Sequence, residues 1–139
     1  MKNICIFAGL VLALNFVSCK KDNSNNSTNP DKATVQTGKW KITNFVDNSV
    51  DETSNFTSYE FTFNSNGTVS AVSSTTTVNG TWSLGTDDSK EKFILNFTNV
   101  QFEELGEDWL VVKIDDTVIQ LSHTSGGNGG IETLSFGKK

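Results

Sequence analysis

The sequence predicts an all-β fold, namely an eight-stranded antiparallel up-and-down β-barrel over residues 37–139. Two observations predict it. From Thr37 onward, apolar and polar residues alternate with a period of two, which is typical of half-buried strands. Turn-forming residues interrupt this alternation about every 8–12 residues, which is the spacing found in barrels and sandwiches. A chain of 139 residues has room for one such domain and a tail.

The strands follow one another along the chain. The first lies around Trp40 and the second around Phe61. Asn66-Gly67 then predicts a tight hairpin, because both residues tolerate positive φ, and the third strand returns over residues 68–74. The inward side chains expected on the other seven strands are, in order, Trp40 and Ile42; Tyr59, Phe61 and Phe63; Val78, Gly80, Trp82 and Leu84; Phe93, Leu95 and Phe97; Leu110, Val112 and Ile114; Ile119 and Leu121; Leu134 and Phe136.

Closure into a barrel is expected because it removes both unpaired edges of the sheet. Alternating strand directions place four connections at one end, which we call the mouth, and three at the other, which we call the closed end. The mouth carries residues 47–55, 75–77, 98–107 and 124–130, and the closed end carries 66–67, 85–91 and 115–117. Long loops on a rigid scaffold usually carry binding, so we expect function at the mouth.

The N-terminus is typical of a lipoprotein signal peptide over residues 1–18. Lys2 precedes an apolar run over residues 4–14, which is shorter than the roughly 20 residues of a membrane-spanning helix. Ser18 and Cys19 then resemble a bacterial lipobox, with Cys19 as the lipidated residue. The resemblance implies a palmitate-type anchor in the outer membrane, with periplasmic and surface-facing orientations both open. An ordinary secretory signal peptide is the alternative.

Residues 19–36 are rich in Asn, Ser and Thr, a composition typical of a solvated tether. Such a tether would reach on the order of 20–25 Å, enough to lift a small domain off a membrane. Cys5 leaves with the signal peptide and Cys19 would carry lipid, so we expect no disulfide in the mature domain. Loss of Lys2 takes the formal net charge from −5 to −6.

The start of the first strand, Gly38-Lys39-Trp40, resembles the Gly-x-Trp signature of lipocalins. The chain is most similar to the small lipocalin-like domains of Bacteroidetes lipoproteins, over roughly residues 37–139. The resemblance implies ligand transport or sequestration. It also implies that Trp40 plugs the closed end beneath a basic residue that follows the last strand. Lys138 lies on the same face of the last strand as Leu134 and Phe136, so it should point inward and form a cation–π pair with Trp40.

A candidate ligand site follows from the same alternation of inward and outward residues. His123 and Glu132 continue the inward series of the last two strands up to the mouth, where a glycine-rich loop lets them approach one another. Asn44 and Tyr59 reach the same rim, and Phe97 is inward. All five could bind a small, mostly apolar ligand, and the four polar residues among them could orient its polar end. The alternative is a merely solvated rim.

Several function classes are disfavoured. All 11 basic residues are Lys and acidic residues outnumber them, which argues against a nucleic-acid partner. His123 is the only histidine that could act as a general base, and no nucleophile motif accompanies it. We therefore expect that the protein is not an enzyme and has neither catalytic residues nor a cofactor.

We expect no dedicated metal site either. Residues 47–52 are acidic but lack the Gly and Glu positions of an EF-hand, and Ile131 stands where a calcium-binding β-roll needs Asp. The carboxylates of residues 103–108 and 87–88 are interpreted as solvated loop charges, with adventitious calcium as the alternative. Thr117, within Asp116-Thr117-Val118, matches a short O-glycosylation pattern of Bacteroidetes, although Asp and Thr are also ordinary turn residues.

Two functional hypotheses follow. In the first, the barrel is a cup that binds a small apolar molecule at its mouth. In the second, the core is filled, and the mouth loops contact another protein or a glycan. The interior volume discriminates between them, because a cavity of roughly 300 Å³ or more would favour the cup.

Overall fold

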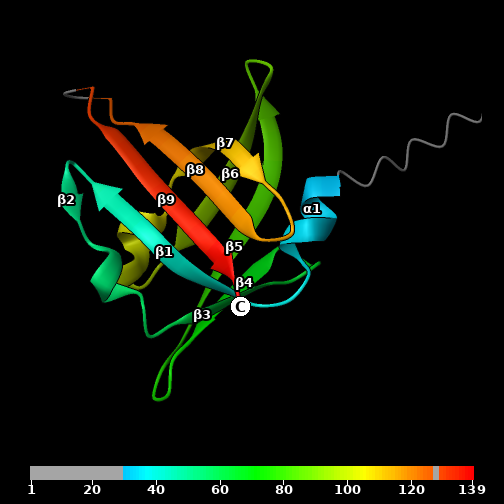
Figure 1. Cartoon of the computed structure of the whole chain (residues 1–139), viewed down its shortest axis with the longest axis vertical. Coiled ribbons are helices and arrows are strands. Elements are labelled where there is room, and N and C mark those ends of the chain that lie inside the picture. Colours follow the sequence, from blue (N-terminus) through cyan, green and yellow to red (C-terminus); the bar gives the residue numbers. More distant parts are fainter. Residues whose placement is uncertain (1–29, 127–128) are drawn as a thin grey trace, which may run out of the picture.

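The computed structural model describes residues 30–126 and 129–139, so the predicted signal peptide, Cys19 and the first part of the tether lie outside the described residues. The regular secondary structure of the described chain is mostly β-strand, with one short α-helix and two 3-10 helices (Figure 1). Within these ranges, no helix is both long and apolar enough to cross a membrane. The elements are α1 (Pro30–Val35), β1 (Trp40–Asp47), β2 (Val50–Asp51), the 3-10 helix η1 (Thr53–Asn55), β3 (Glu60–Phe63), β4 (Thr68–Val72), β5 (Thr77–Asp87), β6 (Lys90–Phe97), the 3-10 helix η2 (Val100–Leu105), β7 (Asp108–Ile114), β8 (Val118–Thr124) and β9 (Ile131–Lys138).

The predicted eight-stranded antiparallel barrel is confirmed, with the short β2 added beside β1. Each strand from β3 to β9 pairs with the next, and β1 pairs with β9 along most of its length, so the two lie side by side (Figure 1). On its other side, β1 is joined to β3 by one register pair, Trp40 with Phe61. We call this weak junction the β1–β3 seam. Towards the mouth, Thr53 covers the open edge of β1, since its Oγ1 accepts a hydrogen bond from the amide of Phe45 at 2.8 Å.

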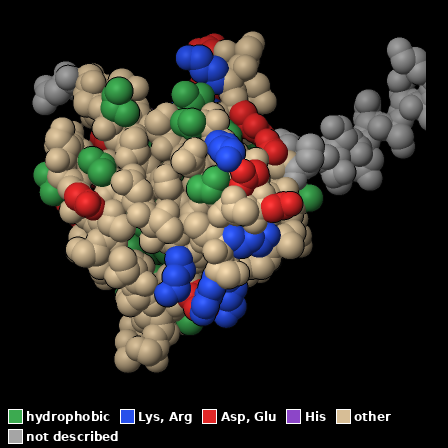
Figure 2. Space-filling view, in the orientation of Figure 1, with side chains coloured by type: hydrophobic (Ala, Val, Ile, Leu, Met, Phe, Trp, Pro, Cys, Tyr) green, Lys and Arg blue, Asp and Glu red, His purple; other side chains and the backbone are tan. Residues whose placement is uncertain are grey.

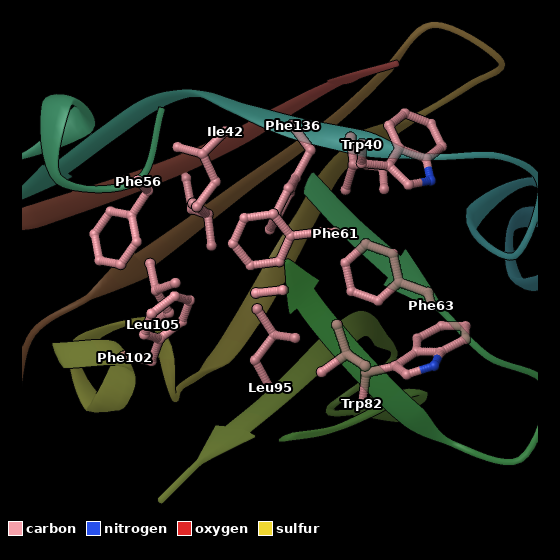
Figure 3. Close-up of a cluster of buried hydrophobic side chains, with 14 of the residues drawn as sticks. Trp40, Ile42, Phe56, Phe61, Phe63, Trp82, Leu95, Phe102, Leu105 and Phe136 are labelled. Carbon is pink, nitrogen blue, oxygen red and sulfur yellow. The ribbon is translucent and has the colours of Figure 1, made fainter. Parts of the chain in front are cut away.

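Hydrophobic side chains fill the interior. Among the described residues 22 hydrophobic residues are buried, and they include every aromatic residue of the barrel domain. Figure 3 shows that they form a continuous row, from Phe56 and Phe102 at one end, through Phe61 and Phe136, to Trp82 and its neighbours at the other. Many rings meet edge to face, for example Phe61 with Phe136 at 5.2 Å between centroids, a favourable geometry for aromatic pairs.

The closed end carries the predicted Trp40 plug. Lys138 Nζ lies 5.2 Å from the centroid of the Trp40 ring, so the expected cation–π pair is confirmed. Gly38 just before it has φ of +86°, and Lys138 Cε lies 3.1 Å from where a Cβ of Gly38 would stand. Both the backbone and the available space therefore favour glycine at this position.

The boundary between tether and domain differs from the prediction. Residues 30–36 were assigned to a solvated tether, but they form α1 and the turn that follows it. Val35 is fully buried, and its carbonyl accepts a hydrogen bond from Trp40 Nε1 at 2.9 Å. The folded domain therefore begins at about residue 30. The sequence pattern does not reveal this boundary, because the anchoring residue, Val35, is a single apolar residue within a polar segment.

A sheet irregularity in β7 overturns two predicted inward positions. In β7 the register shifts between Val111 and Lys113, so Trp109 is fully buried while Val112 is 61% exposed. The predicted inward residues Leu110 and Val112 were therefore wrong, although Ile114 does pack against the core. The inward residues of β3, β6, β8 and β9 are buried as predicted, and on β5 Val78 and Trp82 are buried.

The hairpin predicted at Asn66-Gly67 does join β3 to β4, but with a different turn conformation than expected. At Asn66-Gly67 only the glycine has positive φ, at +84°, and the Asn66 side chain instead accepts a hydrogen bond from the amide of Thr68. Two other turns do have positive φ at two successive residues. They are Asn48-Ser49 after β1 and Asp88-Ser89 after β5. Asn and Asp tolerate this conformation better than other non-glycine residues, which explains their first position in both turns.

Candidate functional site

The mouth of the barrel is closed by side chains from its own long loops. The predicted loops 47–55 and 98–107 contain η1 and η2, and Phe56, Phe102 and Leu105 on or beside these helices are fully buried. Figure 3 shows these three side chains grouped at one end of the core. Phe102 packs edge to face on Phe56, with ring centroids 5.3 Å apart. We call Phe56, Phe102 and Leu105 the mouth plug.

Two of the predicted ligand-binding residues lie beneath this plug. Tyr59 is 8% exposed, and its ring lies 5.0 Å from that of Phe102 at an interplanar angle of 90°. Phe97 is 4% exposed and lies 5.3 Å from the same ring. Both residues are therefore inward, as predicted, but they contact protein at the position where a ligand was expected.

Asn44 lies elsewhere than predicted. The register of β1 shifts between Ile42 and Asn44, so Phe45 takes the inward position. Asn44 Nδ2 donates to Thr133 Oγ1 at 2.8 Å instead. The prediction that Asn44 continues the inward series to the rim was wrong, because simple alternation cannot reveal a bulge.

His123 and Glu132 are brought together as predicted. They are register partners on β8 and β9, and His123 Nδ1 lies 3.1 Å from Glu132 Oε2. Glu132 is 8% exposed, and it is the one charged residue of the described chain that is buried. The ring of His123 also packs against that of Trp109, with centroids 6.0 Å apart, so its orientation is held on two sides.

Two acidic residues at the start of β7 face the other nitrogen of this imidazole. Nε2 of His123 lies 3.9 Å from Glu107 Oε2 and 3.8 Å from Asp108 Oδ1. The side chains of Glu107 and Asp108 are 43% and 55% exposed, so the group opens to solvent on one side. We call Glu107, Asp108, His123 and Glu132 the histidine cluster.

Further carboxylates extend from this cluster around the mouth. Burial, followed by repulsion and a side-chain hydrogen bond from Glu132, raises the pKa of Asp47 above its ordinary value. Burial and the neighbouring Glu52 likewise raise the pKa of Glu104 on η2. The mouth is therefore an acidic rim around an aromatic plug.

Two surface hollows of the described chain lie on the outside of the barrel. One, of about 290 Å³, is bordered by Asp108, Leu110, Ser122 and His123, and also by Lys90 and Lys92. A second, of about 260 Å³, lies over Gly80 and its neighbours on β5 and β6. Most of the face in Figure 2 is uncharged, and lysines gather near the closed end, where Lys39 and Lys139 both contact Glu60.

Thr117 is exposed at the closed-end turn, in the position predicted for it. Its hydroxyl donates to Asp115 Oδ1 at 2.7 Å, and the amides of Thr117 and Val118 donate to the same oxygen. These contacts give Asp115 and Thr117 a structural role in the turn. Glycosylation of Thr117 stays a prediction.

Sequence reasoning missed several residues that make this end of the barrel. Trp109 was missed because the β7 bulge reverses the alternation, and Phe102 because it lies on a short helix within a polar loop. Glu107 and Asp108 were interpreted as solvated loop charges, and Asp108 does lie on the exposed side of its strand. The one available signal was the mouth parity itself, since the 98–107 connection was expected at the same end as His123.

No protein-family model matches this sequence, and no curated protein matches it. The fold does have a counterpart among solved structures. It is similar to the crystal structure of a DUF4847 family protein from Bacteroides vulgatus ATCC 8482, with a TM-score of 0.53 and 15% sequence identity. The similarity covers 78% of this chain and 96% of that chain. At this identity the likeness concerns the fold alone, so the lipocalin and lipoprotein parts of the predicted resemblance stay predictions.

Proposed function

We propose that this protein is a non-catalytic surface module, anchored in the outer membrane through a lipid on Cys19, whose barrel presents its mouth to a protein or glycan partner. The observation that carries the proposal is the mouth plug. Phe56, Phe102 and Leu105 are fully buried, and Phe102 packs on the side chains that a ligand in the cup would contact. This supports the filled barrel over the ligand cup.

The arrangement of the two ends also supports it. Val35 lies against Trp40 at the closed end, so the tether would leave the barrel on the side opposite the mouth. A lipid on Cys19 would then hold the closed end near the membrane and direct the mouth outwards. The rim carries carboxylates, including Asp47, Glu104 and Glu107, so its partner should offer cationic or hydrogen-bond-donating groups.

A ligand-binding experiment separates the filled barrel from the cup. The mature chain carrying Cys19→Ser is incubated with an extract of the producing cells and their medium, then measured by native mass spectrometry. We expect the apo mass under every condition. A discrete added mass that disappears in Tyr59→Ala or His123→Ala would contradict the filled barrel and establish the cup instead.

A capture experiment tests the mouth as the binding surface. Wild-type protein and two exposed charge-reversal variants, Glu103→Lys at the mouth and Asp116→Lys at the closed end, are offered to a fraction of cell-surface proteins and glycans. We expect a partner retained by the wild type and Asp116→Lys but lost by Glu103→Lys. Equal retention by all three proteins would contradict binding at the mouth.

The anchor is tested by metabolic labelling with a radioactive fatty acid. The wild type and Cys5→Ala should incorporate label, because Cys5 lies within the predicted signal peptide, whereas Cys19→Ala should not. Label in Cys19→Ala would show that the anchor is wrongly assigned.

A further inference from the structure

The structure brings an imidazole and two carboxylates together at the mouth, a combination that the sequence did not suggest. We propose that Glu107, Asp108 and His123 bind a Zn²⁺ ion, with Glu132 holding the imidazole in place. One ligand atom from each of the first three residues lies within 4.8 Å of those of the other two. An imidazole nitrogen and two carboxylate oxygens form a donor set suited to zinc and related divalent metals.

With its proton on Nδ1, His123 would direct a lone pair of Nε2 into this group. Glu132 is almost fully buried, and as a carboxylate it accepts a hydrogen bond from Nδ1. In the neutral imidazole, Nε2 is then an acceptor, and it faces oxygens of Glu107 and Asp108, which are acceptors too. Three acceptors therefore converge on one point, an arrangement that a cation between them would stabilise.

The distances suit a metal ion better than a proton. Separations of 3.8 and 3.9 Å from Nε2 to the two oxygens are too long for hydrogen bonds. With metal–ligand bonds of about 2.1 Å in tetrahedral geometry, ligand atoms stand about 3.4 Å apart. The two distances from Nε2 would need to shorten by only about half an ångström. The two carboxylate oxygens, which lie within 4.8 Å of each other, would also have to approach, and both are on exposed side chains that can do so.

Glu132 has the position of a supporting partner. In zinc sites, a ligating histidine usually donates its other ring N–H to a carboxylate, which sets the ring orientation and strengthens the nitrogen as a ligand. Glu132 Oε2 lies 3.1 Å from Nδ1, in position to accept such a bond, and the contact of His123 with Trp109 holds the ring from the side. The imidazole is thus preorganised by two groups that do not themselves reach the proposed ion.

Lys92 is the nearest competing cation. Its Nζ lies 3.5 Å from Asp108 Oδ2 and 3.2 Å from the Asp108 carbonyl oxygen, whereas the oxygen that faces His123 is Oδ1. One oxygen of Asp108 is therefore engaged by Lys92 and the other is directed at the proposed site. The 290 Å³ hollow beside Asp108 and His123 gives access from solvent, leaving room for a water as the fourth ligand.

The first experiment follows the His123 ring itself. It is the only histidine of the chain, so in a protein without a histidine tag its ring resonances need no assignment. Zn²⁺ is titrated into the mature Cys19→Ser chain while these resonances and the fluorescence of the neighbouring Trp109 are recorded. We expect the His123 ring signals to shift in a saturable manner with Zn²⁺, and neither Ca²⁺ nor Mg²⁺ to reproduce the shift.

Variants identify the ligands by calorimetric titration with Zn²⁺. His123→Ala and Asp108→Asn should each weaken binding tenfold or more, and Glu132→Gln by about 10–100-fold, the usual effect of removing such a supporting group. Glu103→Gln, a nearby carboxylate outside the cluster, should change the affinity by no more than about twofold. Lys92→Met should strengthen binding, because it frees the second oxygen of Asp108.

Either of two results would overturn the proposal. The first is a His123 spectrum that does not respond to Zn²⁺. The second is Zn²⁺ binding that is equally strong in His123→Ala, which would place the ion on other carboxylates. Circular dichroism of each variant before titration ensures that a lost affinity reflects a lost ligand in a folded barrel.

Discussion

Replacing Phe102 with alanine tests the filled mouth directly. Phe102 is fully buried on η2, with ring centroids of Tyr59, Phe56 and Phe97 at 5.0, 5.3 and 5.3 Å. Truncating a buried Phe to Ala lowers the free energy of unfolding by about 3–5 kcal/mol. Each aromatic pair adds about 0.5–1.5 kcal/mol to simple burial, although contributions from touching rings do not sum.

We therefore expect Phe102→Ala to lower the free energy of unfolding by about 4 kcal/mol, near the middle of that range. For a domain of this size, such a loss lowers the midpoint of thermal unfolding by about 15–20 °C. The assay is urea unfolding followed by tryptophan fluorescence and far-ultraviolet circular dichroism. Coincident transitions and an unchanged dependence on urea would justify a two-state comparison.

Val100→Ala is the matched control. Val100 begins the same 3-10 helix but is 83% exposed, so its truncation should change stability by no more than about 0.5 kcal/mol. If Phe102→Ala lost less than about 1 kcal/mol, the ring would not be packed as described. The mouth would then be solvated rather than filled, and the plug could not exclude a ligand.

Three further predictions concern packing and charge. Gly80→Ala should destabilise the barrel by about 1–3 kcal/mol in urea unfolding, because its Cβ would lie 2.4 Å from the Asn96 carbonyl oxygen; a neutral effect would contradict this close approach. Hydrogen bonds from Lys139, and then Lys39, lower the pKa of Glu60 to about 2. The ionised Glu60 therefore stabilises the folded barrel fully at pH values above the usual carboxyl range, and this stabilisation is lost as the pH falls towards 2. Glu60→Gln should thus destabilise at neutral pH and have no effect near pH 2 in thermal unfolding, and a pH-independent effect would refute this. Because the pKa of Glu104 is raised, its ionisation opposes folding, so Glu104→Gln should stabilise slightly at neutral pH, with the gain vanishing in acid; stabilisation that persists in acid would have another cause.

The alternation of apolar residues was sufficient to predict the barrel and most of its core. Strands such as β6 and β9 keep strict alternation, so Phe93 and Phe136 are buried as expected. The pattern failed where a strand gains a residue, as in β7, because one extra residue reverses every later side chain. It also failed for Val35, since one apolar residue in a polar segment carries no periodic signal.

The candidate site was predicted only in part, for a related reason. His123 and Glu132 lie on regular strands joined by one hairpin, so their pairing followed from parity. Glu107 and Asp108 reach the same imidazole from a connection whose path depends on η2, and loop geometry cannot be read from alternation. The same helix delivers Phe102 into the mouth, which is why the sequence left the cup and the filled core as open alternatives.

The β1–β3 seam has a consequence for how quickly the barrel folds. Trp40 pairs with Lys138, 98 residues later, whereas β1 and β3 share one register pair. The first strand to be synthesised thus gains most of its ladder from the last, with two further pairs to the short β2. Such distant pairing makes folding slow, because closing the long loop costs chain entropy before the β1–β9 contacts can form and compensate for it. If the chain is exported as proposed above, slow folding would leave it unfolded while export machinery threads it across a membrane. Strengthening the β1–β3 junction should speed folding and, on the export proposed above, hinder secretion.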